Sequence, residues 1–169
     1  LVELIEAAET EGCDWKDLDN LQSADFGSWW LLTLEFLTIA TQFWPARLQE
    51  LVRSSPARHR DAVLRAEADR FRRQGASGPV IVAGSTGSIP AAAELIAAIA
   101  ELDQGVVVLP GLDLGMPDED WAKLNDREIS VIRPSPAVRG HPQYGLAHLL
   151  RHMKLERADV RVLEDSDPA

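Results

Sequence analysis

The chain has 169 residues, of which 46% are hydrophobic, so it can fold as one domain or as a domain with a subdomain. Its net charge of −10 argues against a general nucleic-acid-binding surface. The single cysteine, Cys13, excludes an internal disulfide framework and a four-cysteine iron–sulfur site in this stretch. It also indicates a reducing compartment, and we expect a cytoplasmic protein. We expect no membrane span, because no apolar run is long enough, and no signal peptide in the short acidic start.

The charge is unevenly distributed along the chain. Residues 1–45 carry nine acidic side chains and one lysine, whereas residues 46–76 carry eight arginines and four acidic side chains. Residues 77–169 are acidic again. Only the middle segment is suited to attract phosphate. Because the sequence starts in mid-pattern with Leu1 rather than Met, we expect a fragment of a longer protein.

Residues 1–76 are predicted to form an all-helical subdomain. A helix is expected over residues 1–11, and an acidic loop then leads to Asp25, a residue type that caps helices. The long helix after Asp25 should end or bend at Pro45. Its apolar residues recur at helical spacing, which predicts core packing rather than base stacking for its tryptophans. The stripe consists of Phe26, Trp30, Leu34, Leu37, Thr41 and Trp44, with Trp29 beside it.

Two further helices are expected before the boundary. A short one covers residues 46–53, and a longer one runs from Pro56 to about residue 73 with Ser55 as its N-cap. The small, glycine-containing stretch 74–79 is the best place for a boundary.

Residues 77–169 are predicted to form an α/β segment with a parallel sheet. The apolar, β-branched runs 80–83 and 106–109 suit strands that are buried on both faces. Residues 89–102 between them have helical spacing of apolar side chains and a proline in the first turn. A strand, a crossover helix and a second strand predict a right-handed βαβ unit.

The remaining helices and strands are predicted from weaker sequence signals. Helices are expected over 116–124 and 142–153, with a loop between residues 134 and 140. The β-branched run Ile129–Ile132 predicts a third strand or an edge, and Val160–Leu163 predicts another strand.

Two blocks of this sequence resemble a known family. The stretch VIVAGSTGSIPAAAELIAAIAELDQGVVVLPGLD, with the later block HPQYGLAHLLRHMKLERADVRVL, is similar to the B subunit of bacterial AddAB-type helicase–nucleases. A weaker match lies at Phe43-Trp44-Pro45. The strong blocks cover roughly a third of the chain. The resemblance implies an internal, P-loop-helicase-like piece of a complex that processes double-strand DNA ends in recombinational repair. It also implies an AddA-type partner, ATP and magnesium in the complex, and an iron–sulfur nuclease domain elsewhere in the chain.

The turn after the first strand is the first candidate site. Backbone N–H groups of the turn and the following helix N-terminus favour anions. The turn lacks the lysine and hydroxyl of a Walker motif and the spacing of a dinucleotide fingerprint, so a structural turn is favoured over anion contact or a free-standing Rossmann-like nucleotide enzyme. The candidate residues are Gly84, Ser85, Thr86, Gly87 and Ser88.

The other residues with reactive side chains lack the neighbouring acids, bases or ligands that catalysis or metal binding needs. Asp113 ends the second strand without a paired carboxylate, which favours a turn role over metal catalysis. His148 and His152 have helical spacing suited to zinc but no third ligand nearby, and Cys13 has no arranged base. We therefore predict no catalytic residue, metal or cofactor within these residues.

The arginines of residues 47–73 are the other candidate. Arg58, Arg65 and Arg72 recur every seven residues, with Arg73 adjacent, and they share one helix face. They either form a solvated face with local ion pairs or contact DNA phosphate or a partner subunit in the complex.

Overall fold

The computed structural model describes residues 2–13, 33, 35–125 and 136–163. The chain divides into two compact units, one of residues 1–66 and 89–91, the other of residues 67–88 and 92–169. Each unit is described separately. None of the helices in the described ranges combines the length and the apolar character that a membrane span requires.

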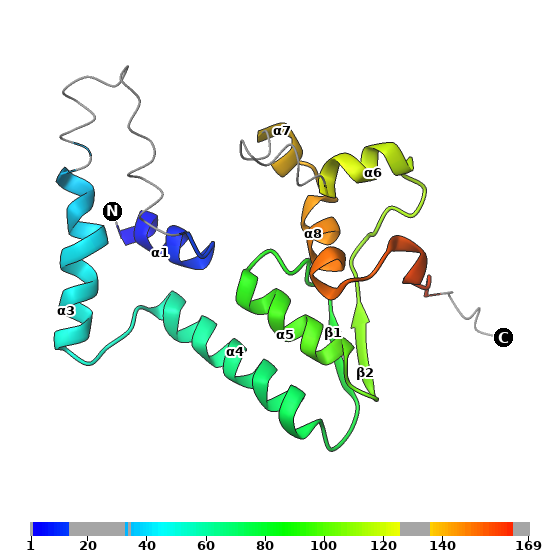
Figure 1. Ribbon diagram of the computed structural model, residues 1–169, viewed down its shortest axis with the longest axis horizontal. Coiled ribbons are helices and arrows are strands. Elements are labelled where there is room, and N and C mark those ends of the chain that lie inside the picture. The colour runs from blue at the N-terminus through cyan, green and yellow to red at the C-terminus, as the bar shows by residue number, and fades with distance from the viewer. Residues whose placement is uncertain (1, 14–32, 34, 126–135, 164–169) are drawn as a thin grey trace. The chain divides into compact units, whose positions relative to one another are not determined.

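The first unit is helical where it is described (Figure 1). It contains α1 (Val2–Thr10), a π-helical turn η2 (Ile39–Phe43) and α3 (Trp44–Glu50). The loop that was expected before Asp25 and the first half of the long helix lie outside the described residues. Pro45 does not end the helical stretch, since it lies in the first turn of α3, directly after the π turn, where a proline is tolerated.

One prediction for this unit is wrong. Trp44 was expected in the core, but it is 39% exposed, and Phe43 beside it is 68% exposed. Leu37 and Thr41 of the same predicted stripe are half-buried. The inserted π turn shifts the angular position of every later residue, so a stripe counted at α-helical spacing no longer lies on one side.

A polar cluster joins α1 to the start of α4 (Pro56–Gln74), the helix predicted after Ser55. The Glu9 carboxylate, whose side chain is only 5% exposed, accepts a hydrogen bond from the Ser55 hydroxyl and pairs with Arg58 at 2.9 Å. Ser55 Oγ accepts from the Arg58 N–H at 3.3 Å, as an N-cap does. The predicted cap is therefore confirmed.

The second unit contains the predicted βαβ motif. Strand β1 (Val80–Ala83) pairs in parallel with β2 (Gly105–Val108), and α5 (Pro90–Ala100) connects them. Together they are the two-stranded parallel sheet of the described residues. The chain is thus mixed α/β, mostly helical, with a small parallel sheet.

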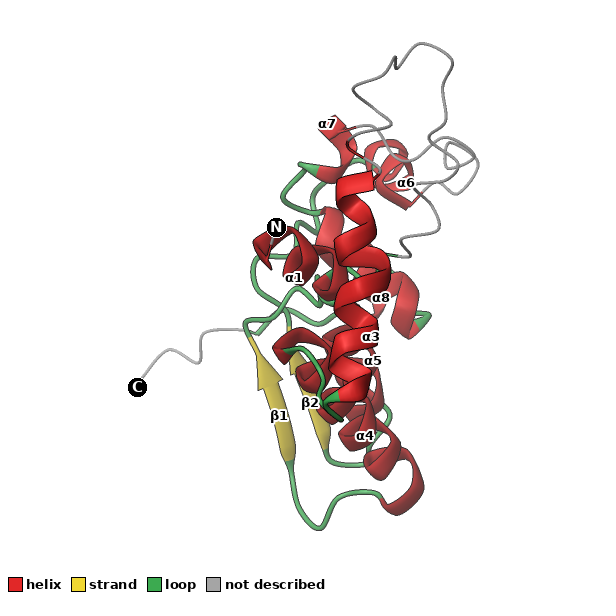
Figure 2. Ribbon diagram, turned by 90° about the vertical axis from the view of Figure 1, so that its left-hand side faces the viewer, coloured by secondary structure: helices red, strands yellow, loops and turns green. Residues whose placement is uncertain are grey.

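Helix α5 covers one face of this sheet (Figure 2). Val80, Val82 and Val107 pack against a core that includes Ala98 and Ile99 of α5. The alternate residues point away from α5, and there Ile81 is 67% exposed and Val106 47% exposed. The sequence predicted burial on both faces, so this expectation is wrong for the described residues.

A second core lies around α6 (Asp118–Asn125) and α8 (Tyr144–Met153). Trp121 and Leu124 of α6 pack with Ala147 and Leu150 of α8. Both predicted helices are confirmed, although α6 begins two residues later than Met116 and α8 begins two residues later than Pro142.

Two further predictions need correction. Residues 134–140 were expected to be a loop, but α7 (Pro136–Arg139) forms a short helix there, because proline is tolerated in a first helical turn. Val160–Leu163 is not a strand, since a 3₁₀ turn (η4, Arg157–Asp159) precedes it and it pairs with no strand of the described residues. Ile129–Ile132 lies outside the described residues.

Candidate functional site

The carboxyl ends of β1 and β2 are where ligands bind in parallel α/β sheets. Two loops lie there. One is the turn of residues 84–88 after β1, and the other is residues 109–117 after β2. These loops contain the sequence candidates Gly84–Ser88 and Asp113, so their contacts decide what this edge of the sheet can do.

The turn after β1 is packed against α8. Gly84 and Gly87 have φ values of +77° and +62°, a conformation in which side chains are strained. A Cβ on Gly87 would lie 2.7 Å from Cδ1 of Leu149, whose residue is 1% exposed. The Gly87 N–H donates to Ser85 Oγ at 3.2 Å. Gly87 is therefore needed for close packing as well as for the turn.

Thr86 makes a second contact with α8. A Cβ on Gly145 would lie 3.4 Å from the Thr86 Cβ, so the small residue permits the loop to approach the helix. The glycines of both segments thus serve loop-to-helix packing. The role of Ser85 and Ser88 toward an anion stays a prediction.

The loop after β2 is held by Gln143, which directly precedes α8. Its Oε1 accepts from the Asp113 N–H at 3.0 Å, and its Nε2 donates to the Gly111 carbonyl at 3.0 Å. The Asp113 carboxylate accepts from the Gly115 N–H at 2.9 Å. Asp113 therefore has the turn role that the sequence favoured.

Arg157 holds the same loop from the C-terminal side. It donates to the carbonyls of Asp113 at 3.3 Å and Met116 at 2.7 Å, and it pairs with the Asp118 carboxylate. Its guanidinium lies 4.8 Å from the Trp121 ring centroid, and its side chain is 11% exposed. The planar guanidinium holds its N–H donors in fixed positions, so one arginine can bind several carbonyl oxygens of a loop at once.

Sequence reasoning missed Gln143 and Arg157 as loop-holding residues. Both lie in the second block that carries the family resemblance, 141–163. That block was the signal available, but the sequence does not show that its polar side chains meet a loop 30 or more residues earlier.

A hollow of about 590 Å³ lies beside this loop. His141 and Lys123 reach it, but both have partners. The His141 Nδ1 accepts from the Gln143 N–H at 3.2 Å, and Lys123 pairs with Asp120 at 2.7 Å. The hydrogen bond to Asp120 raises the pKa of Lys123. No group of three or more metal-ligating side chains occurs in the part of the chain that the structure describes.

The two predicted zinc-spaced histidines do not share a site. The His148 ring packs 4.2 Å from the Tyr144 ring and its Nδ1 lies 2.9 Å from a guanidinium nitrogen of Arg151. Burial lowers the pKa of His148, and the Arg151 charge lowers it further. His152 is exposed to solvent. His148 is therefore packed against Tyr144 and Arg151 of its own helix.

The arginines of α4 meet acidic side chains of the same chain. Arg58 pairs with Glu9, and Arg72 lies 3.6 Å from Glu101 and 3.9 Å from Asp69. Arg70 pairs with Glu67 at 2.6 Å, and this hydrogen bond raises the pKa of Arg70 and lowers that of Glu67. Arg73 is exposed, as is Arg65, which has interactions of its own. Much of the positive charge of this helix is thus compensated locally.

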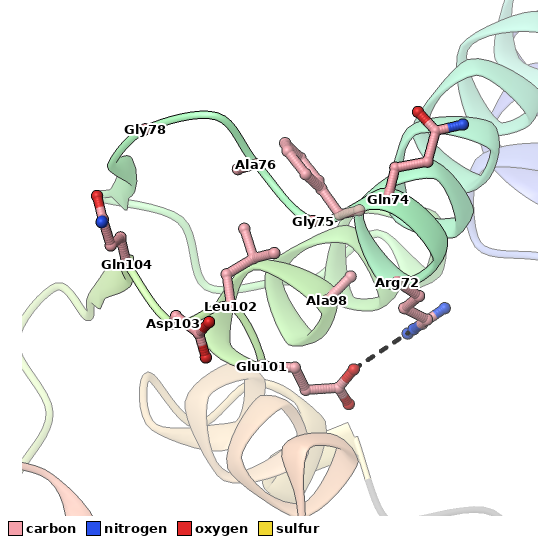
Figure 3. A pocket seen from close by; sticks show the side chains of 11 residues that line it. Arg72, Gln74, Gly75, Ala76, Gly78, Ala98, Glu101, Leu102, Asp103 and Gln104 are labelled. Carbon is pink, nitrogen blue, oxygen red and sulfur yellow. Dashed lines mark ion pairs between the residues drawn. The ribbon is translucent and has the colours of Figure 1, made fainter.

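A separate hollow of about 570 Å³ lies at the amino end of the strands, opposite the loops described above (Figure 3). It is bounded by the end of α4 and by the turn between α5 and β2. Arg72 and Glu101, which form an ion pair, line it together with Asp103 and Gln104. The sequence did not point to this hollow, and its polar lining contains no nucleophile paired with a base.

Cys13 is exposed.

Comparison of the chain with protein-family models, with curated proteins and with solved structures gives no match in any of the three.

Proposed function

We propose that this chain is a helicase-like scaffold segment of an AddB-type subunit, which acts with an AddA-type partner on double-strand DNA ends in the cytoplasm. In this proposal its α/β segment resembles the core of P-loop helicases, without Walker motifs, and residues 1–76 form a separate helical subdomain. The motor, with ATP and magnesium, and the iron–sulfur nuclease domain belong to other parts of the complex.

The observation that carries the proposal is that the two sequence blocks with the family resemblance pack against each other. Leu149 fills the space beside Gly87, Gln143 binds the loop at Gly111 and Asp113, and Arg157 binds that loop again. The contacts support reading the blocks as one unit.

The same contacts support a scaffold rather than a catalyst. A P-loop leaves its backbone N–H groups free for phosphate and adds a lysine, whereas here the loop packs on α8 and has no lysine. Metal-assisted hydrolysis requires more than one ligand around the ion, whereas Asp113 follows β2 without a paired carboxylate and the described residues hold no group of three metal-ligating side chains. The segment is therefore proposed neither to hydrolyse ATP nor to cut DNA.

An ATPase assay with and without single-stranded DNA tests this proposal. We expect no turnover above background for the chain itself. DNA-stimulated turnover that disappears in Asp113→Ala but persists in Asp103→Ala, a control at an exposed residue, would refute the scaffold role.

The exposed arginines supply a possible contact with DNA phosphate or with the partner subunit. Arg58, Arg65, Arg72 and Arg73 are the residues concerned. Fluorescence anisotropy with a blunt DNA duplex, first at low salt and then with added salt, distinguishes DNA contact from partner contact. Binding through phosphate contacts weakens steeply as salt is added. Loss of salt-sensitive binding in Arg73→Ala supports DNA contact. Absence of binding leaves the partner subunit, whose association is then measured directly with the same variant.

The second candidate function is a free-standing Rossmann-like enzyme that binds a nucleotide at residues 84–88. The positive φ of Gly84 and Gly87 favours it, since such turns approach phosphates closely. A nucleotide that binds the folded state raises the unfolding midpoint. A midpoint that does not change with millimolar ATP or NAD argues against this candidate.

A further inference from the structure

One carboxylate of α1 is almost fully buried against an arginine of α4. The Glu9 side chain is 5% exposed, whereas the Arg58 side chain with which it pairs at 2.9 Å is 53% exposed. The Ser55 hydroxyl also donates a hydrogen bond to Glu9. A carboxylate that leaves water needs such partners, because an isolated buried charge is costly. Glu9 therefore neutralises an arginine that solvent can still reach.

A hollow of about 440 Å³ lies at this contact between α1 and α4. Arg58 and Arg65, which are seven residues apart on one face of α4, both line it. Glu9 and Asp61 are the acidic residues of its lining. Asp61 pairs with Arg60 at 2.8 Å. Glu9 is therefore the carboxylate that holds Arg58, one of the two arginines that the hollow brings together.

The two helices that meet here have opposite charge. Residues 1–13 contain four glutamates and no basic side chain, whereas α4 contains six arginines and three acidic side chains. Ile5 is the buried residue of α1, and Val2 and Leu4 are 74% and 49% exposed. Charge thus contributes much of the contact that holds α1 on α4. Such a contact weakens when a competing anion or salt is added.

We propose that α1 is an autoinhibitory segment, in which the Glu9 carboxylate occupies Arg58 in place of a DNA phosphate. The inference rests on the phosphate contact suggested for Arg58 and Arg65 under the proposed function. Carboxylate and phosphate oxygens pair with the same planar guanidinium, so they compete for it. Arg58 meets a phosphate with its full charge only after Glu9 has left. The α1–α4 contact therefore lowers the apparent affinity for DNA by the fraction of molecules in which it is open.

Glu9→Gln tests the inference, with Glu6→Gln as the matched control. Both variants remove one negative charge from α1, but Glu6 is exposed and Glu9 holds Arg58. Binding to a blunt DNA duplex is followed by fluorescence anisotropy. We expect Glu9→Gln to bind about tenfold more tightly at low salt and with a steeper salt dependence, because one more arginine meets phosphate. Glu6→Gln should change the affinity by less than about twofold, and adding Arg58→Ala to Glu9→Gln should remove the gain.

Hydrogen exchange in the unaltered chain gives a second measurement, which decides the matter if Glu9→Gln fails to fold. A helix as short as α1 is marginal when it is detached. Exchange at the α1 amides should therefore become faster when DNA is bound. If Glu9 has only a structural role, α1 stays in place and its exchange is unchanged.

Two outcomes would overturn the autoinhibitory role while the phosphate contact stands. One is DNA binding by the unaltered chain with equal affinities of Glu9→Gln and Glu6→Gln. The other is DNA binding without faster exchange in α1. Absence of DNA binding by every form at low salt would overturn both the autoinhibitory role and the phosphate contact.

Discussion

The carboxyl end of the sheet and the outer edge of β2 differ in how their polar groups are used. At the carboxyl end, Leu149 fills the space beside Gly87, and Gln143 and Arg157 bind the backbone of the loop after β2. Along the outer edge, the Val107 backbone faces an apolar groove. The loops at the position where α/β sheets usually bind ligands are therefore held by contacts within the protein, whereas the described residues leave the outer edge of β2 unpaired.

The largest expected effect on stability comes from adding a side chain at Gly87, in the turn that packs against α8. Gly87→Val should destabilise the folded state by about 3 kcal/mol or more, because it combines a strained positive φ with a clash against Leu149. Urea unfolding followed by circular dichroism measures this change. Gly84→Val is the control, since it has a similar positive φ but nothing within 4 Å of its Cβ. Equal losses in the two variants would mean that Leu149 does not close the turn.

Removing the side chain of Arg157 should have the next largest effect on stability. Arg157→Ala removes donors to the Asp113 and Met116 carbonyls and the contact with Trp121, and it should cost about 2 kcal/mol. Arg161→Ala, at an exposed residue of the same segment, should change stability by less than about 0.5 kcal/mol. Chemical denaturation of both variants makes the comparison. A loss no larger than that of the control would contradict the assignment of Arg157.

A smaller and more local effect is expected from Gln143→Ala. The variant loses the bonds to the Asp113 N–H and the Gly111 carbonyl, which together stabilise the loop by about 1 kcal/mol. Hydrogen exchange at the Asp113 amide should accelerate while exchange within β2 stays slow. Gln74→Ala, at an exposed residue, serves as the control. Unchanged exchange at Asp113 would show that Arg157 holds the loop without Gln143.

The smallest effect concerns pH and the partly buried His148 of α8. His148 has a pKa below its ordinary value of 6.5 in the folded chain, chiefly because of burial and secondarily because of Arg151. The unfolded chain therefore binds the proton more readily, so stability is lost as the pH falls below 6.5 toward the folded pKa. Unfolding midpoints between pH 7.5 and pH 5 measure the slope.

Two variants show which histidine causes this pH dependence of stability. His148→Gln should flatten it, whereas His152→Gln, at an exposed position on the same helix, should leave it unchanged. A slope that persists in His148→Gln would assign the pH dependence to other groups.

The sequence by itself determined the local elements of this protein. The β-branched runs, the glycine-containing turn and the helical spacing between them predicted β1, α5 and β2 within one or two residues. Ser55 as a helix cap and Asp113 as a turn residue followed from side chains that bond to the nearby backbone. Such features depend on residues a few positions apart, and these are visible in a linear pattern.

Only the tertiary structure decided which segments meet. The bonds from Gln143 and Arg157 join residues 30 to 44 positions apart, and no local pattern specifies such pairs. The π turn before Trp44 and the unpaired segment after η4 were missed for a related reason, since an inserted residue or an absent neighbouring strand leaves the apolar pattern unchanged. Burial and pairing depend on what lies opposite a residue in space, and that is settled when the chain packs.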